Sequence, residues 1–247
     1  MWFPYKTERN SSCRCKLFCF HHAGGSSLAF RDWIHLDSSI EVIPVELPGR
    51  GRRIREECRT DLAALMDEIG NEVIKEAKYD RVFLYGHSLG ALLAFKLETV
   101  LENTYGKTAE GLFLSGRHAP GDQDPSPYTT DMGMQALKEE LLRLGNTPGE
   151  LLEDKSFLEY CMPIVFADYR LAEDFSGEEE KVNCPVCAMC GNTDDLAYAE
   201  TVKNWCRITD KQFVFKEFQG GHFFVYKESP DEVKQCIMHL MKNDFRP

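Results

Sequence analysis

The sequence lacks the features that would place the chain in a membrane or carry it through one. No apolar run reaches the roughly 18 residues that a helix needs to span a bilayer. The first residues, Met1–Asn10, lack the apolar core of a secretory signal peptide. Internal repeats and low-complexity tracts are lacking as well, which excludes repeat arrays and compositionally biased disordered chains. We therefore expect a cytoplasmic globular protein with no membrane partner.

Positive charge is also scarce. The chain has 29 lysines and arginines against 40 aspartates and glutamates, which gives a formal net charge of −11 at pH 7. A protein of this charge is not attracted as a whole to nucleic acids or acidic lipids, so we expect no nucleic-acid partner. Four arginines form a local exception after a predicted strand, namely Arg50, Arg52, Arg53 and Arg55.

Ten cysteines are present, and they fit a reducing compartment as free thiols. Cys184, Cys187 and Cys190 have the two-residue spacing of some metal sites. The residues between them form an apolar strand pattern, however, and a spacing of three places successive side chains on opposite faces of a strand. We therefore expect these cysteines to pack in the core, and we expect neither a metal nor another cofactor.

With 247 residues, 43% of them hydrophobic, the chain is long enough to form one α/β domain over residues 1–247. Apolar runs alternate with helical patterns, which predicts a mostly parallel, wound sheet flanked by helices. Strands are predicted over residues 17–20, 41–45, 81–85, 111–114, 186–190 and 212–218. Helices are predicted over residues 28–34, 60–78, 91–103, 197–206 and 231–242.

This alternation is interrupted between residues 121 and 181, where no strand pattern occurs. Helical patterns cover residues 132–144 and 158–175, and Thr147-Pro148-Gly149 separates them. The segment is too long for a simple crossover between two strands. It predicts a helical lid inserted between the fourth strand and the fifth.

The motif Gly86-His87-Ser88-Leu89-Gly90 follows one predicted strand and precedes a predicted helix. This is the context of the G-x-S-x-G nucleophile elbow, whose tight turn projects the serine Oγ from the end of the sheet. Glycines are needed on both sides, because a Cβ at either position would crowd the strand against the helix. The motif predicts that Ser88 is a nucleophile.

Two partners for Ser88 follow in the order that α/β hydrolases use, an acid and then a histidine. Asp194 and Asp195 lie in the loop after the fifth predicted strand, and His222 follows a glycine pair after the sixth. A serine hydroxyl needs a base to take its proton, and the base needs a carboxylate to fix its tautomer. We expect His222 as the base and Asp194 as the acid. The remaining alternative, Asp195, would then cap the following helix or lie in its first turn.

Backbone N–H groups should stabilise the oxyanion that forms during acyl transfer. One donor is expected from Leu89, directly after the nucleophile. The second is expected from Ala23, in the glycine-containing loop after the first predicted strand. His21 and His22 in the same loop are expected to shape or pack the loop rather than to catalyse.

These motifs together carry a specific resemblance. The chain resembles the type II thioesterases, the stand-alone editing hydrolases that serve polyketide and nonribosomal peptide synthetases, and it is similar to the medium-chain fatty-acyl thioesterases. The likeness runs from about Leu17 to Met241, and the run Leu47–Arg52 separates this family from general esterases and lipases. The matching segments are His22–Ser26, Glu46–Arg52, Gly86–Gly90, Gly191–Asp194, Trp205 and Gly220–Phe223.

The resemblance implies an α/β hydrolase fold with Ser88, Asp194 and His222 as its triad. It also implies that the substrate is an acyl group on the phosphopantetheine arm of an acyl or peptidyl carrier protein, which the enzyme would clear from misprimed or stalled synthetases. We expect a monomer. Three alternatives stay open: a medium-chain terminator of fatty-acid synthesis, a general carboxylesterase, and a non-catalytic binding module.

Two further hypotheses depend on the resemblance. The four arginines either contact the acidic carrier protein or its phosphate, or pair with Glu56 and Glu57 in a solvated loop. The apolar residues of the lid either line an acyl channel or pack the lid against the core. The lid residues concerned are Met132, Met134, Leu137, Leu141, Met162, Ile164, Val165 and Phe166.

Overall fold

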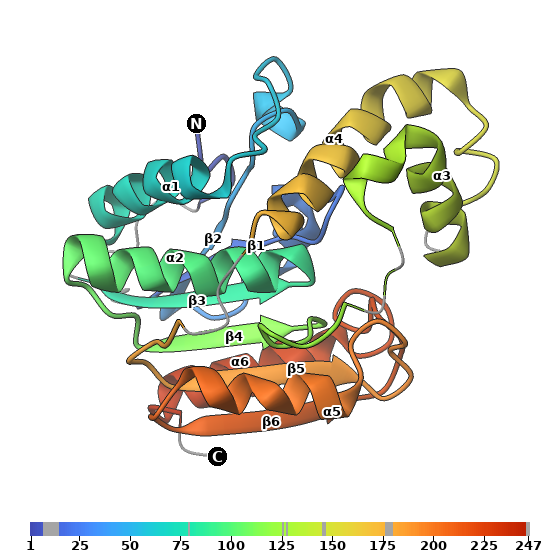
Figure 1. The fold of residues 1–247 in the computed structure, drawn as a ribbon. Coiled ribbons are helices and arrows are strands. Elements are labelled where there is room, and N and C mark those ends of the chain that lie inside the picture. The colour runs from blue at the N-terminus through green and yellow to red at the C-terminus, as the bar shows by residue number, and fades with distance from the viewer. Residues whose placement is uncertain are drawn as a thin grey trace.

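Parallel strands form a six-stranded sheet in the order β2-β1-β3-β4-β5-β6 (Figure 1). The computed structural model describes residues 1–6, 15–78, 80–124, 126, 128–144, 147–175 and 180–245. The strands are β1 (Cys15–Phe20), β2 (Ile40–Pro44), β3 (Arg81–His87), β4 (Gly111–Ser115), β5 (Val186–Gly191) and β6 (Phe213–Phe218). The predicted parallel α/β sheet is confirmed, and every predicted strand overlaps an observed one.

Helices cover both faces of this sheet. The alternation of side chains along β1 shows how the two faces are made, because Phe18 and Phe20 join one apolar cluster whereas Leu17 and Cys19 join the other. The first cluster includes α1 (Leu62–Ala77), α2 (Leu89–Tyr105) and α5 (Ala199–Lys203), and the second includes α6 (Pro230–Lys242). Since both faces are covered, the strands read as continuous apolar runs.

Two predicted helices take a different form in the structure. Residues 28–34 belong to a 3-10 helix, η1 (Ser27–Trp33), in which Phe30 leaves helical geometry with φ −107° and ψ 16°. Residues 197–206 divide into α5 and a second 3-10 helix, η4 (Asn204–Ile208). In η1 the buried aromatic residues are Phe30 and Trp33, three positions apart, which is the spacing that a 3-10 helix aligns on one side.

The three cysteines near β5 lie in the core. Cys187 packs on the α6 face of the sheet, whereas Cys184 and Cys190 pack on the α2 face. The predicted opposite orientation of Cys187 and Cys190 is therefore confirmed. Within the described ranges, no group of three or more His, Cys, Asp or Glu residues could hold a metal ion. In the same part of the chain, every helix is too short or too polar to cross a bilayer.

The segment between β4 and β5 holds a helical insertion, and both helices predicted for it are present. It contains η3 (Thr130–Met132), α3 (Gly133–Leu144) and α4 (Lys155–Glu173). Figure 1 shows α3 and α4 beyond the carboxyl ends of the strands. Parts of the range predicted as a lid, residues 125, 127, 145, 146 and 176–179, lie outside the described residues.

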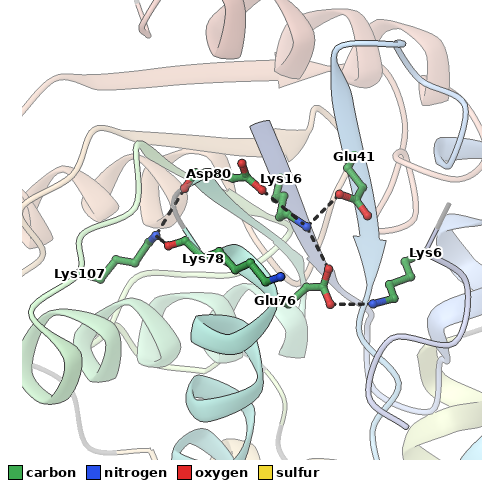
Figure 2. A network of polar contacts seen from close by, with 7 residues as sticks. All are labelled: Lys6, Lys16, Glu41, Glu76, Lys78, Asp80 and Lys107. Carbon is green, nitrogen blue, oxygen red and sulfur yellow. Dashed lines mark hydrogen bonds and ion pairs between the residues drawn. The ribbon is translucent and has the colours of Figure 1, made fainter. Parts of the chain in front are cut away.

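At the amino end of β1, a buried lysine joins the strand to its neighbours (Figure 2). The Lys16 Nζ lies 2.9 Å from a carboxylate oxygen of Glu41 on β2 and 2.9 Å from one of Glu76 on α1. Burial alone would lower the pKa of Lys16, but the bonds to Glu41 and Glu76 raise it overall. Lys6 also binds Glu76, at 2.7 Å, so this network fastens the start of the chain to the sheet.

Glu98 on α2 gives the fold a pH-dependent stability. Its side chain is fully buried, accepts the Ala109 N–H at 2.9 Å, and has a pKa that burial raises from 4.5 to about 8. Between these pH values the unfolded chain releases this proton whereas the folded protein keeps it. The free energy of unfolding should therefore fall with rising pH in this window, by about 1.4 kcal/mol per pH unit.

The substitution Glu98→Gln removes this ionisation, so the free energy of unfolding should depend less on pH in the variant. Between pH 5.5 and 7.5, urea denaturation of the wild type should lose roughly 2–3 kcal/mol that the variant does not lose. The exposed Glu232→Gln is the matched control and should follow the wild type. Parallel stability curves for wild type and Glu98→Gln would contradict the assignment.

Candidate active site

The site lies where the strand order reverses. The chain passes from β1 outward to β2 and then returns across β1 to β3, so the loops after β1 and β3 diverge at the carboxyl edge of the sheet. In open α/β sheets this divergence forms the crevice in which ligands bind. The loop after β1 contains Ala23, and the turn after β3 contains Ser88.

Ser88 occupies a strained turn between β3 and α2. Its backbone has φ 57° and ψ −118°, and its N–H donates to the Ser115 carbonyl at 2.7 Å. A Cβ at Gly86 would lie 1.8 Å from the Gly90 carbonyl oxygen, and a Cβ at Gly90 would lie 2.1 Å from the Phe20 carbonyl oxygen. Both glycines are therefore needed for the close packing of strand and helix, as the sequence predicted.

His222 is held by one of the two candidate acids. Its Nδ1 lies 3.0 and 3.1 Å from the two carboxylate oxygens of Asp194, which is buried. Asp195 is exposed at the surface. The Asp194 Oδ1 also accepts the N–H groups of Leu196 and Ala197, at 2.9 and 3.1 Å. The capping role expected for the acid that does not contact the histidine is wrong for Asp195. The next helix, α5, begins at Ala199, its N-cap is Tyr198, and the acid in its first turn is Glu200.

A cavity of about 940 Å³ opens at this edge of the sheet. Its lining includes Ser88, His222, Ala23 and Leu89. Asp194 is not among the lining residues but contacts the His222 Nδ1. The structure therefore brings together all five residues that the sequence singled out, although they come from four separate segments of the chain. A serine hydroxyl, an imidazole held by a carboxylate and backbone N–H groups beside one cavity are the groups that acyl transfer requires.

Two further histidines pack beside His222 without carrying charge at neutral pH. Burial lowers the pKa of His22 to about 4, with smaller effects from His222 and Arg50, and burial also lowers the pKa of His87 well below its usual range. The His87 ring lies 5.2 Å from the His222 ring, and its Nδ1 is 3.0 Å from the Ser115 Oγ. Neutral neighbours do not oppose the imidazolium that a base must form. Sequence reasoning missed His87, because the elbow motif accepts any residue at that position.

The loop histidines have the packing roles expected of them. The His21 Nδ1 lies 2.8 Å from the His22 carbonyl oxygen, within the loop. The His22 ring lies 5.0 Å from the Phe223 ring, and its Nδ1 is 3.3 Å from the Tyr226 hydroxyl. These contacts join the loop after β1 to the segment that carries His222.

The structure excludes two of the four arginines from a contact with a carrier protein, because Arg50 and Arg53 are buried. Arg52 and Arg55 are exposed, and for them this contact stays a prediction. Arg53 binds Glu56 and stacks on the Trp2 ring at 3.7 Å, so part of the alternative with local ion pairs holds. Arg50 instead binds a residue of α4 that the sequence did not reveal.

The hypothesis that eight apolar lid residues line an acyl channel is wrong, because none of them lines the cavity. Leu137, Met162 and Val165 pack together with Tyr128 as a core of the insertion, whereas Met132 and Met134 are exposed. A helical pattern of apolar residues indicates which side chains are buried, but not which element they pack against. The cavity side of the insertion is mainly polar, with Ser126, Tyr128, Thr129, Glu140, Tyr169 and Glu173 among its residues.

The sheet order, the elbow at its edge and the helices between β4 and β5 are those of an α/β hydrolase. Comparison with known proteins narrows this class. The chain belongs to the thioesterase domain family, whose model matches residues 15–241. Membership in this family supports thioester hydrolysis as the activity.

Individual relatives agree with this placement. The chain is 34% identical to thioesterase PikA5 of Streptomyces venezuelae, over 94% of this chain and 82% of that protein. It is 26% identical to the medium-chain S-acyl fatty acid synthase thioesterase of Rattus norvegicus, over 95% of this chain and 90% of that one. Its structure resembles that of YbtT, a type II thioesterase from the yersiniabactin NRPS/PKS biosynthetic pathway, with a TM-score of 0.84, 25% identity and 97% of each chain covered.

Proposed function

We propose that this protein hydrolyses acyl thioesters carried on the phosphopantetheine arm of a carrier protein, with Ser88, His222 and Asp194 as its catalytic triad. The observation that supports the proposal best is the His222–Asp194 contact of 3.0 Å beside a cavity that Ser88 also lines. The triad alone does not identify the bond cleaved, because a triad of this kind serves oxygen esters equally well. Membership in the thioesterase domain family is the observation that supports a thioester.

In the first step, the His222 Nε2 removes the Ser88 proton while Oγ attacks the thioester carbonyl carbon. The carbonyl electron pair moves to oxygen, and the N–H groups of Leu89 and Ala23 stabilise the oxyanion. The intermediate then collapses, the C–S bond breaks, and the pantetheine sulfur leaves as a thiol with the proton that His222 held. Asp194 stabilises the imidazolium throughout and keeps Nδ1 protonated.

In the second step, water attacks the acyl-enzyme. His222 removes a proton from this water and then returns it to Ser88 Oγ as the ester bond breaks, which releases a carboxylic acid and restores the serine. The insertion over the cavity fits the role of a lid, which would exclude bulk water until the acyl arm enters. We propose the same editing role that type II thioesterases fill in such pathways, namely removal of wrong or stalled acyl groups.

The wall of the cavity that contains Arg117 and Asp124 favours small or polar acyl groups over medium-chain alkyl groups. These two residues form an ion pair of 3.4 Å, and the Asp124 carboxylate is exposed. An alkyl chain at this wall would remove water from the carboxylate without replacing its hydrogen bonds, at a cost of about 1–3 kcal/mol.

A panel of acyl-carrier proteins tests this proposal. We expect acetyl, malonyl or aminoacyl groups to give a kcat/KM at least about tenfold above that of octanoyl. A preference of the wild type for octanoyl would instead indicate a chain terminator, and a preference for p-nitrophenyl esters over thioesters would indicate a carboxylesterase.

A further inference from the structure

A buried ion pair joins the insertion to the loop after β2. Arg50 and Asp168 form two short contacts, Nη1 to Oδ2 at 2.6 Å and Nη2 to Oδ1 at 2.8 Å. Asp168 lies on α4 with no exposed surface, and Arg50 is 3% exposed. A fully desolvated pair of this kind is weak evidence for stability, because removal of both charges is often neutral or stabilising. Stability alone therefore does not explain why this ion pair is present.

Both partners also bind the turn that contains Ala23. The Gly24 N–H donates to Asp168 Oδ2 at 2.7 Å, and Arg50 Nη1 donates to the Gly25 carbonyl at 3.4 Å. The turn itself is closed by a bond of 3.0 Å from the Gly25 N–H to the His22 carbonyl. Gly24 has φ +74°, as the third position of a type II turn requires. The ion pair thus holds the turn at two of its peptide groups.

These bonds determine which N–H group is left for a ligand. The Gly24 N–H is taken by Asp168 and the Gly25 N–H by His22, whereas no partner within the described structure binds the Ala23 N–H. The helix also touches the turn directly, because a Cβ at Gly24 would lie 2.9 Å from Val165 Cγ2 on α4. The turn is therefore seated on α4 by one apolar contact and by the carboxylate of Asp168.

We propose that Asp168 and Arg50 are positioning residues, which hold the turn so that the Ala23 N–H faces the oxyanion. The inference rests on the proposed function, since it assigns a role to the ion pair only if Ser88 forms a tetrahedral intermediate. It also couples two events: a displacement of α4 that opened the cavity would withdraw the carboxylate from Gly24. The oxyanion is then fully stabilised only while α4 contacts the turn that contains Ala23.

Two double variants separate positioning from stability. Both remove the charges together, so neither leaves a buried charge without its partner. Arg50→Met with Asp168→Asn keeps a side-chain oxygen that can accept the Gly24 N–H, whereas Arg50→Met with Asp168→Ala has no acceptor there. We expect the alanine double variant to lose kcat by about 10²-fold, as for a lost or misplaced oxyanion donor. The asparagine double variant should stay within about tenfold of the wild type.

Three measurements distinguish this role from a structural one. Affinity for an alkyl boronic acid, which forms a tetrahedral adduct with the serine, should fall in the alanine variant by the same factor as kcat/KM. Affinity for a carrier protein bearing a non-hydrolysable amide analogue should stay within about twofold, and the pH dependence of kcat/KM should keep its wild-type shape. If the Asp168 carboxylate bound the substrate rather than the turn, the alanine double variant would lose affinity for the amide analogue. That result would overturn the proposal.

Equal losses in the two double variants, or wild-type kcat in the alanine variant, would also overturn it. If the alanine double variant does not fold, Arg50→Lys provides the comparison, because it keeps the charge but loses the planar guanidinium group. Its affinity for the boronic acid should fall at least about threefold. An unchanged affinity would contradict the positioning role. Boronate binding to the wild type, and its loss in Ser88→Ala, tests the proposed function separately.

Discussion

Replacement of Ser88 by alanine should reduce the turnover of an acyl-carrier thioester by roughly 10⁴- to 10⁶-fold. In the proposed mechanism this hydroxyl forms the acyl-enzyme. Without it, the proposed donors Leu89 and Ala23 could stabilise only an oxyanion that arises from direct attack of water. Release of the pantetheine thiol, followed with a thiol reagent at saturating substrate, gives kcat directly. A single-turnover experiment should also lose the rapid first release of thiol.

The control for this substitution is Ser39→Ala, on the exposed loop before β2, which should keep wild-type turnover. Ser88 has a positive φ, so thermal unfolding must show that the alanine variant remains folded at the assay temperature. A folded Ser88→Ala protein, free of contaminating esterase, that retained more than about a hundredth of the wild-type rate would contradict the assignment of the nucleophile.

Replacement of Asp194 by asparagine should lower kcat by about 10⁴-fold, with little change in the affinity for substrate. Asparagine keeps an oxygen for the Leu196 and Ala197 N–H groups, so the loop has an acceptor for both bonds. It cannot stabilise the His222 imidazolium with a negative charge, and its amide favours the tautomer with the proton on the wrong nitrogen. Steady-state kinetics on one acyl-carrier substrate measures both parameters.

Asp195→Asn is the matched control, because it makes the same chemical change one residue further along the chain, at an exposed site. It should stay within about twofold of the wild type, as surface substitutions away from the site usually do. The opposite result, an inactive Asp195→Asn and an active Asp194→Asn, would mean that the loop rearranges around substrate and that the contact with His222 does not persist.

The sequence predicted the elements that depend on local chemistry. The elbow around Ser88 was predictable because a serine between two close-packed glycines admits few other structures. Asp194 and His222 follow strands, and parallel strands bring their carboxyl ends to one edge of the sheet. Local pattern and topology together were therefore enough to predict that Ser88, Asp194 and His222 lie at one edge of the sheet.

What the sequence could not predict depends on contacts between distant segments. Arg50 belongs to a loop and Asp168 to a helix more than a hundred residues later, and each alone resembles an ordinary exposed charge. The cavity side of the insertion was missed for a related reason, because Leu137 and Val165 are as apolar as channel residues but pack against each other. His87 carried no signal, since only the three-dimensional site places it against His222.

The central claim is that the hydroxyl of Ser88 reacts covalently because His222 activates it. Treatment of the intact protein with a fluorophosphonate, followed by mass spectrometry of the whole chain and of its peptides, tests this claim most directly. We predict one adduct per chain, located on Ser88, and a loss of thioester hydrolysis in proportion to labelling. Labelling of a different residue, or hydrolysis that continues at the full rate once Ser88 is completely modified, would contradict the account.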